Sequence, residues 1–244
     1  MCGRFVATAP PGELADYFQA VLSESVADAE LEPSYNVAPT NQVHTVRARE
    51  GHREIEAMRW GLVPSWAKDQ KIGSRMINAR ADTVATKPAF RSAVKKRRCL
   101  VPADGFYEWH KVDGQKQKDP YFITRKDGEP VVFAGLWEAW KPKPGTEAYD
   151  VAMEQAGGDD LPWLITCTLI TTDPNKEMKS IHHRMPVLVP PSDWDRWLDP
   201  DNGVDQVSDI LVPAPDDLLE VTRITTRVNN VRNKGPELIE PAPS

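Results

Sequence analysis

Between residues 98 and 189 the chain alternates short β-prone segments with turns, and this pattern constrains the fold more than any other feature. The segments are rich in Val, Ile, Phe, Tyr, Trp and Thr, which favour strands. Glycines, including Gly114 and Gly128, and several prolines separate them. The predicted strands cover residues 98–102, 105–110, 120–125, 131–140, 163–172 and 185–189. Many short strands with few helices predict an α+β fold, in which a curved or barrel-like, mostly antiparallel sheet is flanked by a few helices.

The rest of the chain adds two strands and several short helices. Residues 11–22 place Leu14, Phe18, Val21 and Leu22 at helical spacing, so we expect one amphipathic helix there. The other expected elements are a strand pair at 42–48 and 54–60 with Gly51 in the turn, helical pieces within 82–97, short helices near 194–198 and 204–211, and a final strand over 219–228.

Length and composition indicate one globular domain. The chain has 244 residues, of which 40% are hydrophobic and 27% charged, and we expect a single domain over 1–244. The Pro-, Gly- and acid-rich segment 141–162 is expected to be a surface insertion, and 236–244 a Pro-rich tail. No apolar run approaches the roughly 20 residues of a membrane span, and no secretory signal opens the sequence. We therefore expect no membrane partner.

The cysteines and the net charge indicate which kinds of site and partner are unfavourable for this chain. Cys2, Cys99 and Cys167 lack CxxC spacing, which disfavours a disulfide scaffold or a zinc site. We expect no metal, no cofactor and a reducing cytoplasmic setting. The net charge of −6 argues only weakly against a nucleic-acid partner, because basic residues cluster at 91–98 and 223–234. The run at 95–98 is expected to form a solvated helix end.

Cys2 directly follows the initiator Met1, and methionine aminopeptidases remove Met1 when the next side chain is small. The mature chain would then begin with an α-amine, of pKa about 7.7–8.0, beside a thiol of pKa about 8.5. Such a 1,2-aminothiol condenses with an aldehyde to an imine, and the thiol closes the ring to a thiazolidine. Judged by its position alone, the alternative is that Cys2 has no special role and merely follows the initiator methionine.

Four stretches hold polar residues among apolar neighbours. Glu108 lies between aromatic residues, so desolvation would raise its pKa toward the general acid/base range, unless it faces solvent. His182 and His183 are adjacent and face opposite ways if extended. No HExxH, P-loop, GxGxxG or GxSxG motif occurs. The four stretches are residues 2–4, 77–80, 105–109 and 181–186.

Together with further segments, these stretches resemble one family in order along nearly the whole chain. The family is that of the SOS-response-associated peptidase (SRAP) proteins, also called abasic-site processing proteins. The matching stretches are residues 1–5, 35–40, 60–66, 77–80, 102–109, 181–186 and 229–233.

The resemblance implies covalent capture of abasic sites in single-stranded DNA during the response to DNA damage. Cys2 would supply the amine and thiol of a thiazolidine crosslink. Asn78 would hold the sugar, Glu108 would shuttle protons at the amine, and His182 would protonate the sugar ring oxygen. An imine intermediate would also permit β-elimination, a lyase reaction. The peptidase name implies removal of residues ahead of Cys2, here Met1 alone, which a host aminopeptidase can also remove.

The resemblance also implies a DNA-binding cleft. Arg4, Arg80 and Arg184 would contact phosphates, and Trp66 would stack on or wedge beside an unpaired base. The cleft would also be lined by Gly3 and Asn36. We expect a monomer that associates with the nucleoid when bound to DNA. The sequence leaves open whether the replication machinery is also a partner.

Two other functions remain open from the residues. A thiol peptidase acting on other proteins could use Cys2, His182 and Glu108 as a triad. A non-catalytic reader of modified bases would need affinity that does not depend on Cys2.

Overall fold

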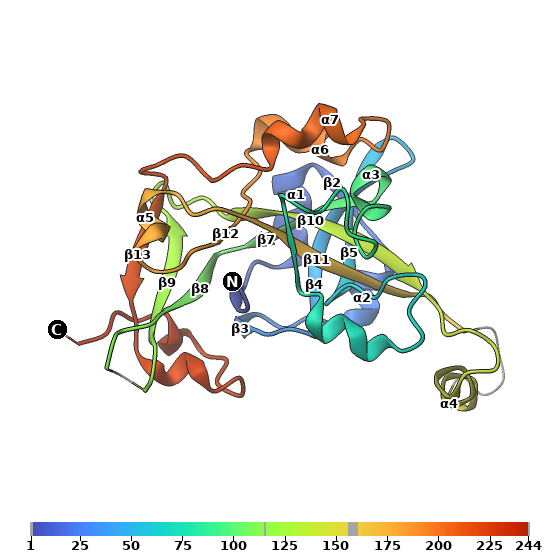
Figure 1. Ribbon diagram of the computed structural model, residues 1–244, viewed down its shortest axis with the longest axis horizontal. Helices are drawn as coiled ribbons and strands as arrows, with labels where there is room; N and C mark the ends of the chain where they lie inside the picture. The colour runs from blue at the N-terminus through green and yellow to red at the C-terminus, as the bar shows by residue number, and fades with distance from the viewer. Residues whose placement is uncertain (1, 115, 156–160, 244) are drawn as a thin grey trace.

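Two β-sheets make up most of the fold of this computed structural model, which describes residues 2–114, 116–155 and 161–243 (Figure 1). In the first sheet every neighbouring pair is antiparallel, in the order β13-β9-β8-β1-β3. Its central strand, β8, carries Glu108. The strands are β1 (Phe5–Ala7), β3 (Ser34–Val37), β8 (Gly105–His110), β9 (Asp119–Arg125) and β13 (Leu219–Arg223).

The second sheet closes on itself into a five-stranded barrel. Its strands follow the order β11-β10-β7-β4-β5, and β5 pairs back onto β11 in parallel. Shorter strands extend this sheet, β2 beside β5, and β6 and β12 beside β11. The strands are β2 (Ala20–Leu22), β4 (Gln42–Arg49), β5 (His52–Trp60), β6 (Asn78–Arg80), β7 (Arg98–Ala103), β10 (Val131–Trp140), β11 (Leu164–Thr172) and β12 (Met185–Pro186).

Two positions in these sheets require glycine, one for its backbone angles and one for close packing. The β4–β5 turn is Glu50-Gly51, and both residues have positive φ angles, of 50° and 82°. A two-residue hairpin turn with both angles positive favours glycine. Gly105 begins β8, where a Cβ atom would lie 2.6 Å from the carbonyl oxygen of Ile123. The absence of a side chain therefore lets β8 pack closely against β9.

Short helices cover the barrel on one side. From α1, Leu14 and Phe18 are buried, and from α6, Trp194, Trp197 and Leu198. These side chains form one apolar cluster, here called the helix-covered core. In Figure 1, α6 and α7 lie together at the top, whereas α4 projects from the lower right. The helices are α1 (Pro11–Phe18), α2 (Glu24–Ala29), α3 (Ala93–Lys96), α4 (Glu147–Gln155), α5 (Lys176–Lys179), α6 (Trp194–Leu198) and α7 (Val204–Val207).

A second apolar cluster joins the barrel to the antiparallel sheet and is here called the seam. Trp60 and Phe133 reach it from the barrel, and Phe5 and Phe106 reach it from the sheet. The ring of Phe5 lies 5.0 Å from that of Trp60 and 5.8 Å from that of Phe133. Burying each such side chain stabilises the fold by about 1.5–3 kcal/mol. Cys2 is part of the seam, so the start of the chain is held between the two sheets.

The predicted α+β fold with a barrel-like sheet is confirmed, and so is the hairpin around Gly51. The helix expected over 11–22 was too long. It ends at Phe18, because Gln19 adopts a left-handed conformation with φ of 49° and the next residues pair with β5 as β2. Residues 82–92 form turns, and only α3 is helical within 82–97.

The final strand expected over 219–228 was also too long, since β13 ends at Arg223 and a 3₁₀ turn covers Thr226–Asn229. The segment expected as a tail is anchored, because Pro241 forms a bridge with Ile224. The expected insertion contains α4, and its residues 156–160 lie outside the described part of the chain.

The cationic run at 95–98 was expected to be solvated, but Arg98 is only 2% exposed. Its guanidinium ties β7 to the helix-covered core by donating to main-chain carbonyls. These belong to Val94, Lys95, Trp197, Asp199 and Asn202. Sequence could not reveal this role, since three of the partners lie about a hundred positions away.

Candidate active site

Cys2 lies at the entry to β1 and is completely buried. The Asn78 side-chain amide donates a hydrogen bond of 2.8 Å to the Cys2 carbonyl. Asn78 begins β6, where it pairs in parallel with Leu169 of β11. The barrel therefore positions Asn78, and Asn78 in turn fixes the backbone that carries the thiol.

The other polar atom of Asn78 is unused. Its Oδ1 is buried and has no hydrogen-bond partner among the described residues. A buried acceptor without a partner costs about 1–3 kcal/mol, and such atoms concentrate where a ligand is to be bound. Asn78 thus presents a free acceptor beside Cys2.

Glu108 approaches from the antiparallel sheet. It is only 2% exposed, and its strand β8 pairs with β1, with Phe106 opposite Phe5. Burial raises the pKa of the Glu108 carboxyl, and the ammonium of Lys118 partly offsets this rise. The expectation that Glu108 is desolvated rather than exposed is confirmed. A carboxyl group in this state is suited to exchanging protons near neutral pH.

The Cys2 thiol is also perturbed. Burial raises its pKa well above the ordinary value, and the negative charge of Glu108 raises it further. The thiol and the carboxyl are therefore close enough to interact, and the thiol stays protonated at neutral pH. This differs from the activated thiolate of cysteine proteases, whose pKa is lowered by a cationic neighbour.

His182 follows α5, and its backbone N–H donates to the Met178 carbonyl at 2.8 Å. Nδ1 of its ring lies 3.0 Å from the backbone nitrogen of Arg184 and 3.1 Å from the Arg184 carbonyl oxygen, so the Arg184 backbone anchors the ring in either tautomer. Burial lowers the pKa of His182 to about 4, so the ring is neutral at pH 7. The ring stacks on His183 at 4.3 Å.

Lys118 is a functional candidate that sequence reasoning missed. It is exposed, near the start of β9, and its charge lowers the pKa of both Glu108 and His182. Both groups therefore lie within electrostatic reach of one ammonium. The signal available in the sequence was the recurrence of Lys111, Lys116 and Lys118 around the turn at Gly114.

The residues expected to contact DNA fall into two groups. Trp66 is 48% exposed on the loop after β5. Arg80 is exposed and paired with Asp82, its Nη2 lying 2.5 Å from Oδ2. Gly3 and Arg4 are partly buried beside Cys2. These side chains and this backbone are accessible at least in part.

Two other candidates are buried. Asn36 is 0% exposed and Arg184 is 5% exposed. The Arg184 guanidinium pairs with Asp173 at 3.0 Å and donates to the Thr171 carbonyl at 2.5 Å. The amide of Asn36 is bonded to Arg4 and to main-chain carbonyls. Both side chains are thus engaged within the protein, instead of lining an open surface.

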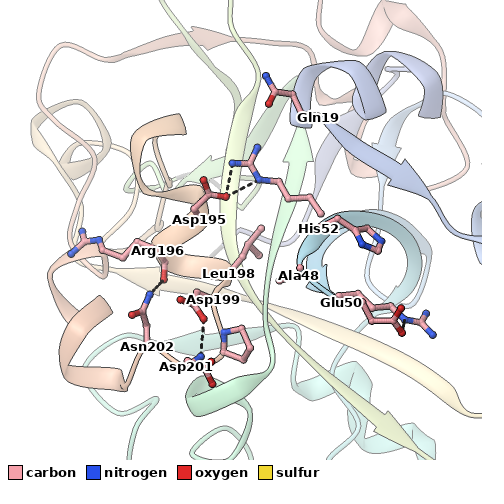
Figure 2. Close-up of a pocket in the computed structure, with 14 residues that line it drawn as sticks. Gln19, Ala48, Glu50, His52, Asp195, Arg196, Leu198, Asp199, Asp201 and Asn202 are labelled. Atoms are coloured by element: carbon pink, nitrogen blue, oxygen red, sulfur yellow. Dashed lines mark hydrogen bonds and ion pairs between the residues drawn. The ribbon is translucent and has the colours of Figure 1, made fainter.

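A large cavity lies elsewhere and carries no comparable chemistry. It measures about 770 Å³ and lies between the β4–β5 turn and α6 (Figure 2). Arg53 donates to Asp195 across it at 3.1 and 2.7 Å, and Asp199 accepts from the backbone of Asp201. The residues that line it include none of the four catalytic candidates.

In residues 2–114, 116–155 and 161–243 there is no group of three or more His, Cys, Asp or Glu side chains that could hold a metal ion. Within the same ranges, no helix has the length and apolar character needed to cross a membrane.

The chain matches one known class of protein over most of its length. A family model for the SOS response associated peptidase (SRAP) matches residues 1–231, so the chain belongs to this family, as its motifs predicted. The abasic site processing protein YoqW of Bacillus subtilis (strain 168) is 39% identical over 241 residues, which cover 98% of this chain and 99% of that protein.

More distant relatives share the same framework. The abasic site processing protein HMCES of Pongo abelii is 35% identical over 234 residues, which cover 86% of this chain and 65% of that protein. A crystal structure of a protein from Bacteroides thetaiotaomicron superimposes with a TM-score of 0.81 at 25% identity, covering 99% of this chain and 100% of that one.

Proposed function

We propose that this protein processes abasic sites in single-stranded DNA by forming a covalent link through Cys2 once Met1 has been removed. The observation that carries the proposal is the placement of a buried Cys2 beside Glu108 and Asn78. Membership in a family whose relatives are named abasic site processing proteins supports it.

The reaction uses both nucleophiles of Cys2 in sequence. The α-amine adds first to the aldehyde carbon of the ring-opened sugar. Loss of one water gives an imine. The thiol then adds across the C=N bond, sulfur to carbon and proton to nitrogen, and closes a five-membered thiazolidine. One water is released, and no oxidation or reduction occurs.

Glu108 moves the protons in this sequence. Its desolvated carboxylate takes a proton from the attacking nitrogen and returns it to the departing hydroxyl. The same carboxyl can reverse these steps, so it sets whether the link persists. Its raised pKa brings the two protonation states closer in free energy at neutral pH.

Asn78 and His182 act on the sugar. The unpaired Oδ1 of Asn78 accepts from the amine or from a sugar hydroxyl. The Nε2–H of neutral His182 donates to the sugar ring oxygen and so favours the open aldehyde. With a pKa near 4, His182 serves better as a hydrogen-bond donor than as a source of free protons.

DNA binding rests on the accessible candidates. Arg4, Arg80 and Lys118 contact phosphates, which are read by charge without regard to sequence. Trp66 stacks on an unpaired base beside the lesion. Gly3 allows the sugar to approach the backbone. Arg184 is a supporting residue, because its backbone anchors Nδ1 of the His182 ring.

Two further activities belong to the proposal. The imine permits β-elimination at the sugar, so strand cleavage competes with thiazolidine closure. Removal of Met1 exposes the amine, either by a host aminopeptidase or by the protein itself. An uncleaved N-terminal tag abolishes the stable adduct in either case.

The test is a denaturing gel of the Met1-free protein with single-stranded DNA that contains one abasic site. A denaturation-resistant adduct is expected, and Cys2→Ala should remove it entirely. Cys167→Ala is the matched control, since Cys167 is equally buried but lies within the barrel. Equal adduct yield from Cys2→Ala would rule out the mechanism. Base-dependent DNA affinity without any adduct would instead indicate a non-catalytic reader.

A further inference from the structure

Asn36 has an unusually complete set of hydrogen bonds for a side chain in a sheet. It is fully buried in β3. Its Oδ1 accepts from Nη1 of Arg4 at 2.8 Å. Its Nδ2 points at three main-chain carbonyls, those of Val228, Asn230 and Asn233, at 3.2, 3.2 and 3.0 Å. The side chain therefore joins the N-terminal segment to residues 226–234, here called the C-terminal loop.

Other contacts strengthen the same junction. Nζ of Lys234 donates to the Asn36 carbonyl at 2.6 Å, and the backbone N–H of Tyr35 donates to the Lys234 carbonyl. Arg4 also donates to the Val228 carbonyl at 3.1 Å. The C-terminal loop, more than 190 positions away along the chain, is thus fastened to β3 and to Arg4 together.

Arg4 in turn is close to the reacting group. Its carbonyl accepts from the backbone N–H of Tyr107, the residue before Glu108, at 3.0 Å. The same carbonyl lies 3.8 Å from Sγ of Cys2. A shift of Arg4 would therefore move Cys2 relative to Glu108.

We propose that Asn36 is a positioning residue, which couples the C-terminal loop to Arg4 and thereby fixes Cys2 against Glu108. Asn36 acts through Arg4 and does not touch DNA. This inference deepens the proposed function, since it assumes that Cys2 is the nucleophile. A misplacement of about 1 Å in a reacting group can cost on the order of 100-fold in rate.

The first measurement is single-turnover adduct formation by Asn36→Leu at several DNA concentrations. Leu keeps the volume of the side chain and removes its hydrogen bonds. We expect the maximal rate to fall about tenfold or more; any change in the half-saturating DNA concentration, through the phosphate contact of Arg4, comes in addition to this fall. A change confined to the half-saturating concentration would mean that Asn36 acts on DNA binding, directly or through Arg4, and not on the position of Cys2, and would overturn the inference. An unchanged maximal rate would do the same.

The second measurement needs no DNA. Cys2, Cys99 and Cys167 are all 0% exposed, so their alkylation by iodoacetamide, followed by mass spectrometry, reports local opening. Asn36→Leu should speed labelling of Cys2 about tenfold and leave Cys99 and Cys167 protected. Faster labelling of all three would indicate general destabilisation and overturn the inference, as would unchanged labelling of Cys2.

Two companion variants complete the design. Arg4→Met should expose Cys2 in the same way, and Asn36→Leu with Arg4→Met should be no worse than the stronger single change, because both break one linkage. Additive effects would contradict this. Asn202→Ala is the matched control, since its amide donates to the Arg196 carbonyl beside the cavity of Figure 2. If wild type forms no adduct, the proposed function fails, while labelling still decides the role of Asn36.

Discussion

The helix-covered core and the seam bury polar groups in opposite ways. In the helix-covered core, Arg98 donates to five main-chain carbonyls. In the seam region, Asn78 keeps an acceptor unpaired and Glu108 is held in a desolvated state that raises its pKa. A buried polar group whose bonds are complete stabilises the fold. One whose bonds are incomplete, next to a nucleophile, marks where a substrate completes them.

The largest effect should come from Glu108→Gln, which keeps the shape and removes the titrating group. Loss of general acid/base catalysis typically costs about 10²–10⁴-fold in rate. In wild type the rate should rise with pH as Glu108 ionises, with a midpoint above the ordinary value of 4.5 because its pKa is raised. The variant should lack this rise and keep only the increase toward pH 8 that comes from deprotonation of the α-amine. Single-turnover rates between pH 4 and 8 measure both, and an unchanged profile would remove Glu108 from the mechanism.

Arg98→Met should lower the stability of the fold and leave the reaction rate unchanged, which is the reverse of the effect of Glu108→Gln. It leaves buried carbonyls without their donor, so we expect a loss of about 3–5 kcal/mol in the free energy of unfolding. Adduct formation per folded molecule should stay the same, since Arg98 bonds only to the helix-covered side. Urea unfolding and active-site titration separate the two quantities. A large rate loss in molecules that remain folded would break the contrast between the two regions.

The smallest effect should be on the pH dependence of the free energy of unfolding, to which the titration of His182 contributes. Its pKa falls from 6.5 in the unfolded chain to about 4 in the folded one, so the unfolded state binds more protons between these values. The stabilising contribution is complete above pH 6.5 and is lost progressively as pH falls toward 4. His182→Gln should flatten this part of the stability curve. Urea midpoints at pH 7 and pH 5 provide the comparison, and an identical slope in both proteins would show that His182 does not titrate as inferred.

Sequence predicted what depends on local pattern. Alternating strands and the turn at Gly51 placed the β4–β5 hairpin. Cys2, Asn78 and Glu108, which come from three separate motifs, lie together in the structure. The sequence did not predict which residues far apart along the chain pair with each other. The helix after Pro11 stops at Phe18 because β2 pairs with β5, more than thirty positions onward.

Three polar residues whose burial the sequence did not predict share one cause. Asn36, Arg98 and Arg184 all bond to main-chain carbonyls brought near by the fold. Carbonyls belong to every residue, so no side-chain pattern in the sequence signals such partners. Lys118 was missed for a related reason, because its proximity to Glu108 and His182 arises only when the β8–β9 hairpin meets the segment after α5.

Strand β11 pairs with β10, β5, β6 and β12. The strand that closes the barrel therefore also holds Asn78 in place. A slip of one residue in its register would turn every side chain to the opposite face, opening the barrel and withdrawing Asn78 from Cys2 at once. We therefore expect a change of length within β11 to be far more damaging than one in segment 141–162, ahead of the strand.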